Sequence, residues 1–95
     1  MTGEVLVENR IELEEDHVVF VTRFERCRHL LYLIAGRILG GNERIEDAVR
    51  HCFTTASRKP PKFRYEGAFR CWLLRVLIDE ALLILIQERE RINYV

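Results

Sequence analysis

The 95-residue sequence is poor in residues that interrupt regular structure and in long apolar runs. Five glycines and two prolines are too few for the many turns of a β-sandwich or barrel. The longest apolar run, residues 81–86, is far shorter than the about 20 residues of a membrane-spanning helix. A content of 48% hydrophobic and 32% charged residues is typical of a globular chain, not a disordered one. We therefore expect one soluble domain that does not bind a membrane.

Cysteine is scarce, and its pattern excludes a disulfide framework. The sequence has three cysteines, Cys27, Cys52 and Cys71, which is an odd number. None of them forms a Cys-x-x-Cys motif. The acidic N-terminal segment, residues 1–16, lacks the apolar core of a signal peptide. Free thiols and the missing leader both favour a reducing, cytoplasmic location.

Histidine and cysteine neighbours do not predict a metal site. The pairs Cys27 with His29 and His51 with Cys52 lack zinc-site spacing. On a helix, residues one or two positions apart point in different directions. No glycine-rich phosphate loop occurs, and no local signature supports a catalytic Cys–His pair. We therefore expect no metal, no cofactor and no enzymatic activity.

No charge of one sign prevails overall, because 15 bases balance 15 acids. The charges are nevertheless segregated along the chain. Residues 1–22 carry six acids and one base, whereas residues 50–75 carry seven bases and a single acid, Glu66. A basic centre of this kind is typical of a chain that binds polyanions locally. A basic face that is merely solvated would carry the same charge, so both interpretations remain open.

Hydrophobic periodicity predicts an all-α fold. Helical spacing of apolar residues occurs over residues 18–28 and again over residues 30–39, which end at Gly40-Gly41. A third helix is expected from an N-cap at Asn42 to the stop at Pro60-Pro61. Its apolar stripe consists of Ile45, Ala48, Val49, Cys52, Phe53 and Ala56.

The last predicted helix runs from about residue 67 to residue 90 and is apolar nearly all round after Val76. Such a helix is central to its domain or buried against a partner. We expect a compact bundle of about four helices in one domain, residues 16–92. An acidic, frayed N-terminus, residues 1–15, precedes it.

The segment between the last two predicted helices, residues 57–67, interleaves bases with the aromatic residues Phe63 and Tyr65. Single-stranded nucleic acid is bound by this mixture, because cations contact phosphates and aromatic faces stack on bases. In the alternative interpretation, Phe63 packs into the core and the bases are only solvated.

Four stretches of the chain, in order and with consistent gaps, match one known pattern. They are Leu31-Tyr32-Leu33-Ile34-Ala35-Gly36-Arg37-Ile38-Leu39-Gly40, Glu46-Asp47-Ala48-Val49 with Phe53, Phe63-Arg64-Tyr65-Glu66-Gly67-Ala68-Phe69-Arg70, and Trp72-Leu73-Leu74-Arg75-Val76 with Glu80-Ala81-Leu82. Together, over residues 32–87, they resemble region 2 of bacterial sigma factors of the sigma-70 family, in particular the small extracytoplasmic-function (ECF) group.

The resemblance implies a helical domain that acts in transcription initiation. In the family, the helix expected here after Asn42 docks on the clamp helices of the β′ subunit of the RNA polymerase core. The following loop and last helix capture the non-template strand of the promoter −10 element, and one base is flipped out of the stack.

Two sets of residues are carried over from the family by position. The polymerase-binding set is Glu46, Asp47, Arg50, His51 and Phe53. The DNA-binding set is Lys59, Lys62, Phe63, Arg64, Tyr65, Arg70, Trp72, Arg75 and Asp79. Trp72 fits a place in the core equally well.

Several residues depart from the family pattern. Arg50-His51 stands where the family usually has Gln-Glu, and Thr54 and Ser57 replace a usual Leu and Trp. Ile78-Asp79 stands where Arg-Asn is common, and Asp79 would repel phosphate. The first change replaces an acid on the polymerase-facing side, and the change at Asp79 argues against the family's DNA recognition in this chain.

Further along the last helix, apolar residues occupy positions that are polar in the family. Ile78, Leu83 and Ile86 would form an apolar face that self-association, an anti-sigma protein or another partner could cover. A core shifted by one stripe would explain the same pattern. We also expect no helix-turn-helix that reads the −35 element.

Two functions follow as expectations. The first is a region 2 domain that binds the polymerase core and the promoter −10 element. The alternative is a degenerate sigma-like adaptor or dimerisation module without DNA recognition.

Overall fold

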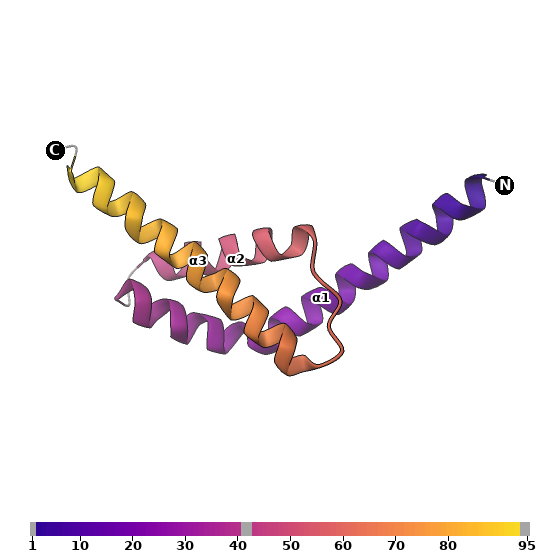
Figure 1. The fold of residues 1–95 in the computed structure, drawn as a ribbon, viewed down its shortest axis with the longest axis horizontal. Helices are drawn as coiled ribbons and strands as arrows, with labels where there is room; N and C mark the ends of the chain where they lie inside the picture. The colour runs from indigo at the N-terminus through magenta and orange to yellow at the C-terminus, as the bar shows by residue number, and fades with distance from the viewer. Residues whose placement is uncertain (1, 41–42, 94–95) are drawn as a thin grey trace.

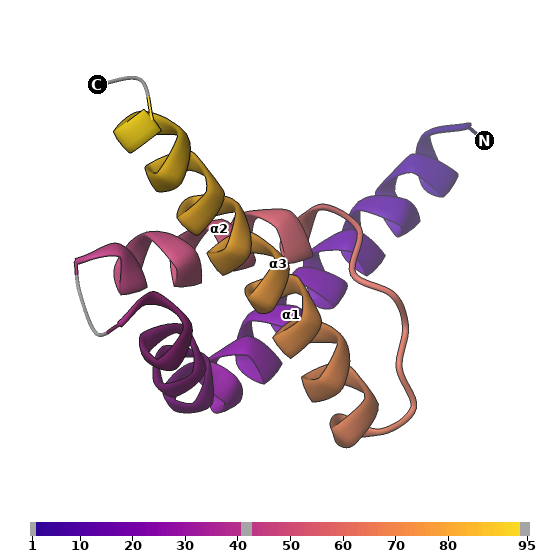
Figure 2. The ribbon, with the colours of Figure 1, turned by 60° about the vertical axis from the view of Figure 1, so that its left-hand side comes forward.

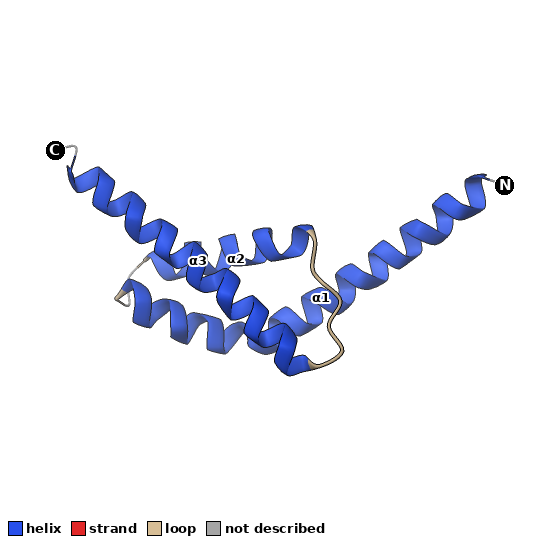
Figure 3. Ribbon diagram, viewed as in Figure 1, coloured by secondary structure: helices blue, strands red, loops and turns tan. Residues whose placement is uncertain are grey.

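Three helices make up the part of the chain that the structure describes (Figure 1). The computed structural model describes residues 2–40 and 43–93, with α1 at Thr2–Leu39, α2 at Arg44–Arg58 and α3 at Glu66–Asn93. No strand occurs within these residues (Figure 3). The predicted all-α class is confirmed, but the described bundle has three helices instead of about four.

The difference in helix number arises in α1, which is continuous where two helices were expected. Phe24, Cys27, Leu31 and Ala35 are all buried and continue one helical stripe through the expected break. No glycine or proline lies near residue 29 to interrupt it. The backbone of residues 2–15 belongs to the same helix, and its fraying stays a prediction.

The end of α1 depends on a glycine in a left-handed conformation. Gly40 has φ 78°, and its N–H donates a hydrogen bond of 2.9 Å to the carbonyl oxygen of Gly36. Glycine adopts this conformation without steric cost and so commonly ends helices. The predicted N-cap of the next helix, Asn42, lies outside the described residues.

Each helix packs against the other two, and α3 lies across α1 and α2 (Figures 1 and 2). The N-terminal part of α1 and the C-terminal part of α3 extend beyond this three-helix contact. The buried core residues are Phe20, Phe24, Cys27, Leu31, Ala35, Leu39, Ala48, Val49, Cys52, Ala56, Phe69, Leu73, Leu77, Ala81 and Ile84.

The apolar stripe predicted for α2 is confirmed. Four of its members are buried, and Ile45 and Phe53 pack against the core while half-buried. Phe53 lies between α2 and α1, with its ring centroid 5.6 Å from that of Phe20 and 5.0 Å from that of Phe24. This aromatic contact is one of the main links between the two helices.

Candidate nucleic-acid and polymerase interface

A loop without regular structure joins α2 to α3 and carries most of the predicted DNA-binding residues. Helix α2 ends at Arg58, and Pro60-Pro61 cannot continue it, because proline lacks the backbone N–H and restricts the preceding residue. Helix α3 begins at Glu66, and the N–H of Phe69 donates to the carbonyl oxygen of Tyr65 over 3.2 Å. The loop is therefore fixed at both ends by helices of one core.

The two aromatic residues of the loop have different environments. Phe63 is half-buried, with its ring centroid 6.1 Å from that of Phe69 and 5.6 Å from that of Trp72. Tyr65 is 71% exposed. Phe63 therefore anchors the loop to α3, as in the alternative considered from the sequence, and Tyr65 presents an aromatic face to solvent.

Trp72 belongs to the same aromatic cluster. It is half-buried, and its ring centroid lies 5.8 Å from that of Phe69. The structure thus supports the interpretation of Trp72 as a residue that packs against the core. Its remaining exposed edge borders the loop.

The predicted cations are divided between the loop and α3. Lys59, Lys62 and Arg64 are exposed on the loop, and Arg75 is exposed on α3. Arg70 is exposed on α3 too; burial raises the pKa of the Cys27 thiol on α1, and the positive charge of Arg70 opposes that rise. Three of the predicted cations thus lie on the loop, and the charge of Arg70 influences a residue of α1.

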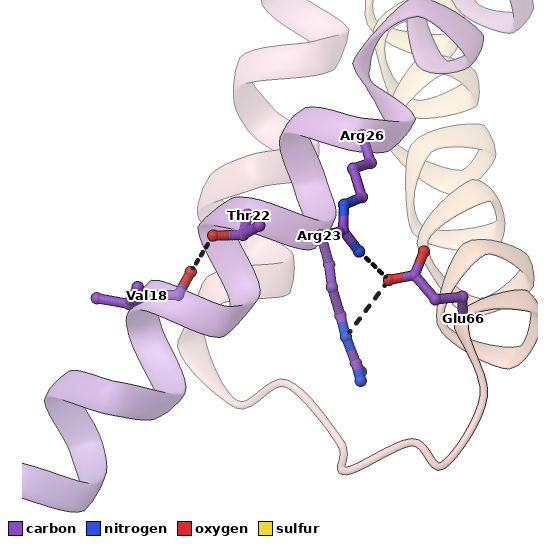
Figure 4. Close-up of polar contacts among 5 residues, drawn as sticks. All are labelled: Val18, Thr22, Arg23, Arg26 and Glu66. Atoms are coloured by element: carbon purple, nitrogen blue, oxygen red, sulfur yellow. Dashed lines mark hydrogen bonds and ion pairs between the residues drawn. The ribbon is translucent and has the colours of Figure 1, made fainter.

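Glu66 is bound by two arginines of α1 that sequence reasoning did not identify (Figure 4). Arg26 Nη1 donates to Glu66 Oε1 over 2.8 Å, and Arg23 Nε lies 3.9 Å from the same oxygen. The Arg23 guanidinium also lies 5.6 Å from the centroid of the Phe69 ring. The only acid within residues 50–75 is thereby paired with arginines of α1.

One side-chain hydrogen bond lies in the turn of α1 that precedes these arginines. Thr22 Oγ1 donates to the carbonyl oxygen of Val18 over 2.9 Å within α1 (Figure 4). Val18 itself is exposed. No sequence signal pairs residues of α1 with Glu66, because the partners are separated by 40 positions.

The predicted polymerase-binding residues lie on α2, and most are exposed. Glu46, Arg50 and His51 are exposed, and Asp47 is half-buried and forms an ion pair with Arg50 one turn away. Phe53 instead packs between α2 and α1. The exposed surface of α2 is therefore polar and charged, and Phe53 packs against α1 on the buried side of the same helix.

Two tertiary contacts fix α2 against α3. Thr55 Oγ1 donates to Glu80 Oε1 over 2.7 Å, and Arg44 Nε lies 3.2 Å from Glu88 Oε1. Together with the core, they hold the exposed side of α2 at a set orientation to the loop. Thr54, one of the departures from the family pattern, donates its hydroxyl to the carbonyl oxygen of Arg50.

The outward side of α3 exposes large apolar residues. The predicted members Ile78, Leu83 and Ile86 are 38%, 49% and 53% exposed, and Leu82 is 46% exposed. Leu82 was missed, although it lies one helical turn from Ile78 and from Ile86. The core is therefore not shifted onto this stripe. Association through it stays a prediction.

The buried thiols are inert by environment. Burial is the main cause that raises the pKa of Cys52 to about 12, with Glu80 and Cys27 adding to it. The Cys52 thiol donates to the carbonyl oxygen of Leu73 over 3.7 Å. Burial also raises the pKa of Cys27, and Cys71 is exposed. Within the described residues, no cluster of three or more potential metal ligands occurs.

Within residues 2–40 and 43–93, no helix is both long enough and apolar enough to cross a membrane.

The described part of the chain is an all-helical domain with an exposed basic loop between two helices of one core. The sequence comparison identifies its family. The family model of sigma-70 region 2 matches residues 23–91, which include the second half of α1, all of α2 and nearly all of α3. The chain belongs to the sigma-70 region 2 family, a family of transcription factor domains. No curated protein and no solved structure gave a significant match.

Proposed function

We propose that this chain binds the RNA polymerase core through α2 and the non-template strand of a promoter −10 element through the loop and α3. It acts in transcription initiation in the bacterial cytoplasm, as a member of the extracytoplasmic-function group. The role is binding, and the polymerase performs the chemistry. Membership of the sigma-70 region 2 family supports the proposal.

The observation that carries the DNA-binding part is the combination of free cations with a free aromatic face on one short loop. Lys59, Lys62 and Arg64 are exposed, as is Tyr65, and none of the three cations forms an ion pair within the described residues. Phosphates and unstacked bases are the ligands that suit this combination. The Arg26–Glu66 contact and the Phe63 anchor pre-order the loop, which reduces the entropy lost on binding.

The polymerase-binding part rests on the exposed, charged side of α2. Core polymerase is immobilised, and association of the whole chain is followed by interferometry at low salt. We expect binding that Glu46→Lys weakens at least tenfold, because it reverses a charge on the docking side. The same reversal at Glu25, which is exposed on α1, is the control and should leave binding unchanged. Absence of binding by the unsubstituted chain would contradict this part.

A second candidate function is a sigma-derived adaptor that has lost promoter recognition and binds the polymerase or an anti-sigma protein. One observation favours it: Asp79 presents a negative charge on the outward side of α3, where it would repel phosphate. Polymerase binding without any gain in affinity for a −10 strand would select this candidate.

A further inference from the structure

The outward side of α3 is an apolar strip bordered by opposite charges. Leu82 and Ile86 are about half exposed at its centre, and Ile78 and Leu83 flank them on opposite sides. Asp79 and Arg89, both exposed, lie one turn before and one turn after the central pair. Among the ion pairs of the described residues, none includes Asp79 or Arg89.

These positions follow the spacing of a helix–helix seam. Asp79, Leu82, Ile86 and Arg89 are separated by three, four and three residues, which is the alternation that keeps side chains on one line of contact between two helices. Helices α1 and α2 cover the opposite side of α3, where Leu77, Ala81 and Ile84 are buried. The seam is therefore open to a partner helix along its length.

We propose that a second copy of this chain covers the seam, with the two α3 helices antiparallel about a two-fold axis at the level of Ile84. In the register that sets Leu82 opposite Ile86 of the partner subunit, Asp79 falls opposite Arg89 of the partner subunit. This follows because Asp79 precedes Leu82 by three residues and Arg89 follows Ile86 by three. The two-fold axis repeats both contacts, so two apolar pairs lie between two ion pairs.

The charge pattern selects this arrangement over a parallel one. A parallel pair in register would place Asp79 opposite its own copy and Arg89 opposite its own copy, and like charges at a contact disfavour association. In the antiparallel pair every charge of the seam meets its opposite. The strip is thus self-complementary, as a two-fold interface requires.

The size of the seam indicates a weak dimer. From Asp79 to Arg89 the helix rises about 15 Å, and a single helix pair of this length buries less than the about 1,600 Å² of a standard interface. We therefore expect a dissociation constant on the order of micromolar. Such a dimer forms and dissociates with protein concentration.

A functional consequence rests on the proposed function. Asp79 belongs to the predicted DNA-binding set and is covered by the dimer, and Arg75 of the same set lies one turn before the seam. The dimer and the promoter strand would then exclude each other. The test of the dimer uses no DNA and no polymerase, so it fails or succeeds independently of the proposed function.

Sedimentation of the whole chain from roughly 1 to 500 μM tests the proposal. We expect a reversible monomer–dimer equilibrium that Ile86→Glu shifts to the monomer. Asp79→Arg alone and Arg89→Asp alone should each raise the dissociation constant at least tenfold, because each creates two like-charge contacts. An equimolar mixture of these two variants should dimerise again, since every contact between the two different chains is then attractive.

Glu25→Arg, which makes a similar charge reversal at an exposed position of α1, is the matched control and should leave the dimer intact. Circular dichroism checks that each variant keeps its helices. A chain that stays monomeric over the whole range would overturn the proposal. A dimer that survives Asp79→Arg, or single variants that the mixture does not rescue, would overturn it as well.

Discussion

The Arg26 guanidinium donates a 2.8 Å hydrogen bond to the carboxylate of Glu66, and this contact joins the middle of α1 to the first turn of α3. It fixes the point at which the basic loop ends. It also pairs the only carboxylate within residues 50–75 with a cation of α1. One ion pair thus has a structural and an electrostatic consequence.

The strength of this pair can be measured by a double-mutant cycle. Both side chains are at least half exposed, so solvent screens them and the coupling free energy should be only about 0.5 kcal/mol. Glu66→Gln, Arg26→Gln and the double variant are compared by urea unfolding. Additive effects, with no coupling, would mean that the pair does not form in solution.

The two aromatic residues of the loop should separate stability from binding. Phe63→Ala removes a half-buried ring that contacts Phe69 and Trp72, so it should lower the free energy of unfolding by about 2 kcal/mol. Tyr65→Ala should leave stability within about 0.5 kcal/mol and weaken single-strand binding by roughly 1–3 kcal/mol, the value of one stacked base. The reverse pattern would contradict the assigned roles.

The loop cations should be visible in the salt dependence of DNA binding. Lys62→Ala and Arg64→Ala should each reduce the slope of log affinity against log salt by about 0.7 for each lost phosphate contact. Arg37→Ala, at an exposed position in the last turn of α1, is the control and should leave the slope unchanged. Slopes that do not change in the loop variants would place the DNA contact elsewhere.

Alkaline pH should destabilise the domain through Cys52. Its folded pKa of about 12 lies above the ordinary value of 9.0 because the thiol is buried, so the unfolded state releases a proton that the folded state retains. Below pH 9 this group gives no pH dependence, and between pH 9 and 12 stability falls by about 1 kcal/mol for each pH unit. Urea unfolding at several pH values should show this slope in the unsubstituted chain and a smaller one in Cys52→Ala.

The elements that were predicted correctly from the sequence are those that depend on local chemistry. The stripe of α2 could be read because Ala48, Val49, Cys52 and Ala56 repeat at helical spacing, and the loop could be placed because Pro60-Pro61 stops a helix. The end of α1 at Gly40 followed from the same kind of local signal.

What the sequence missed depended on tertiary contacts. The continuity of α1 is set by a buried stripe that packs on two other helices, and the polar residues around His29 hid it. Arg26 and Glu66 meet only because α1 and α3 are adjacent. Phe63 could have faced either solvent or the core, and the ring cluster with Trp72 resolves this in favour of packing.

The measurement that tests the proposed function most directly is the anisotropy of a fluorescent single-stranded −10-type oligonucleotide, alone and with core polymerase, at two salt concentrations. We expect binding by this chain that strengthens when polymerase is present and weakens at the higher salt. Polymerase binding without any gain in affinity for the strand would contradict promoter recognition and leave the adaptor function.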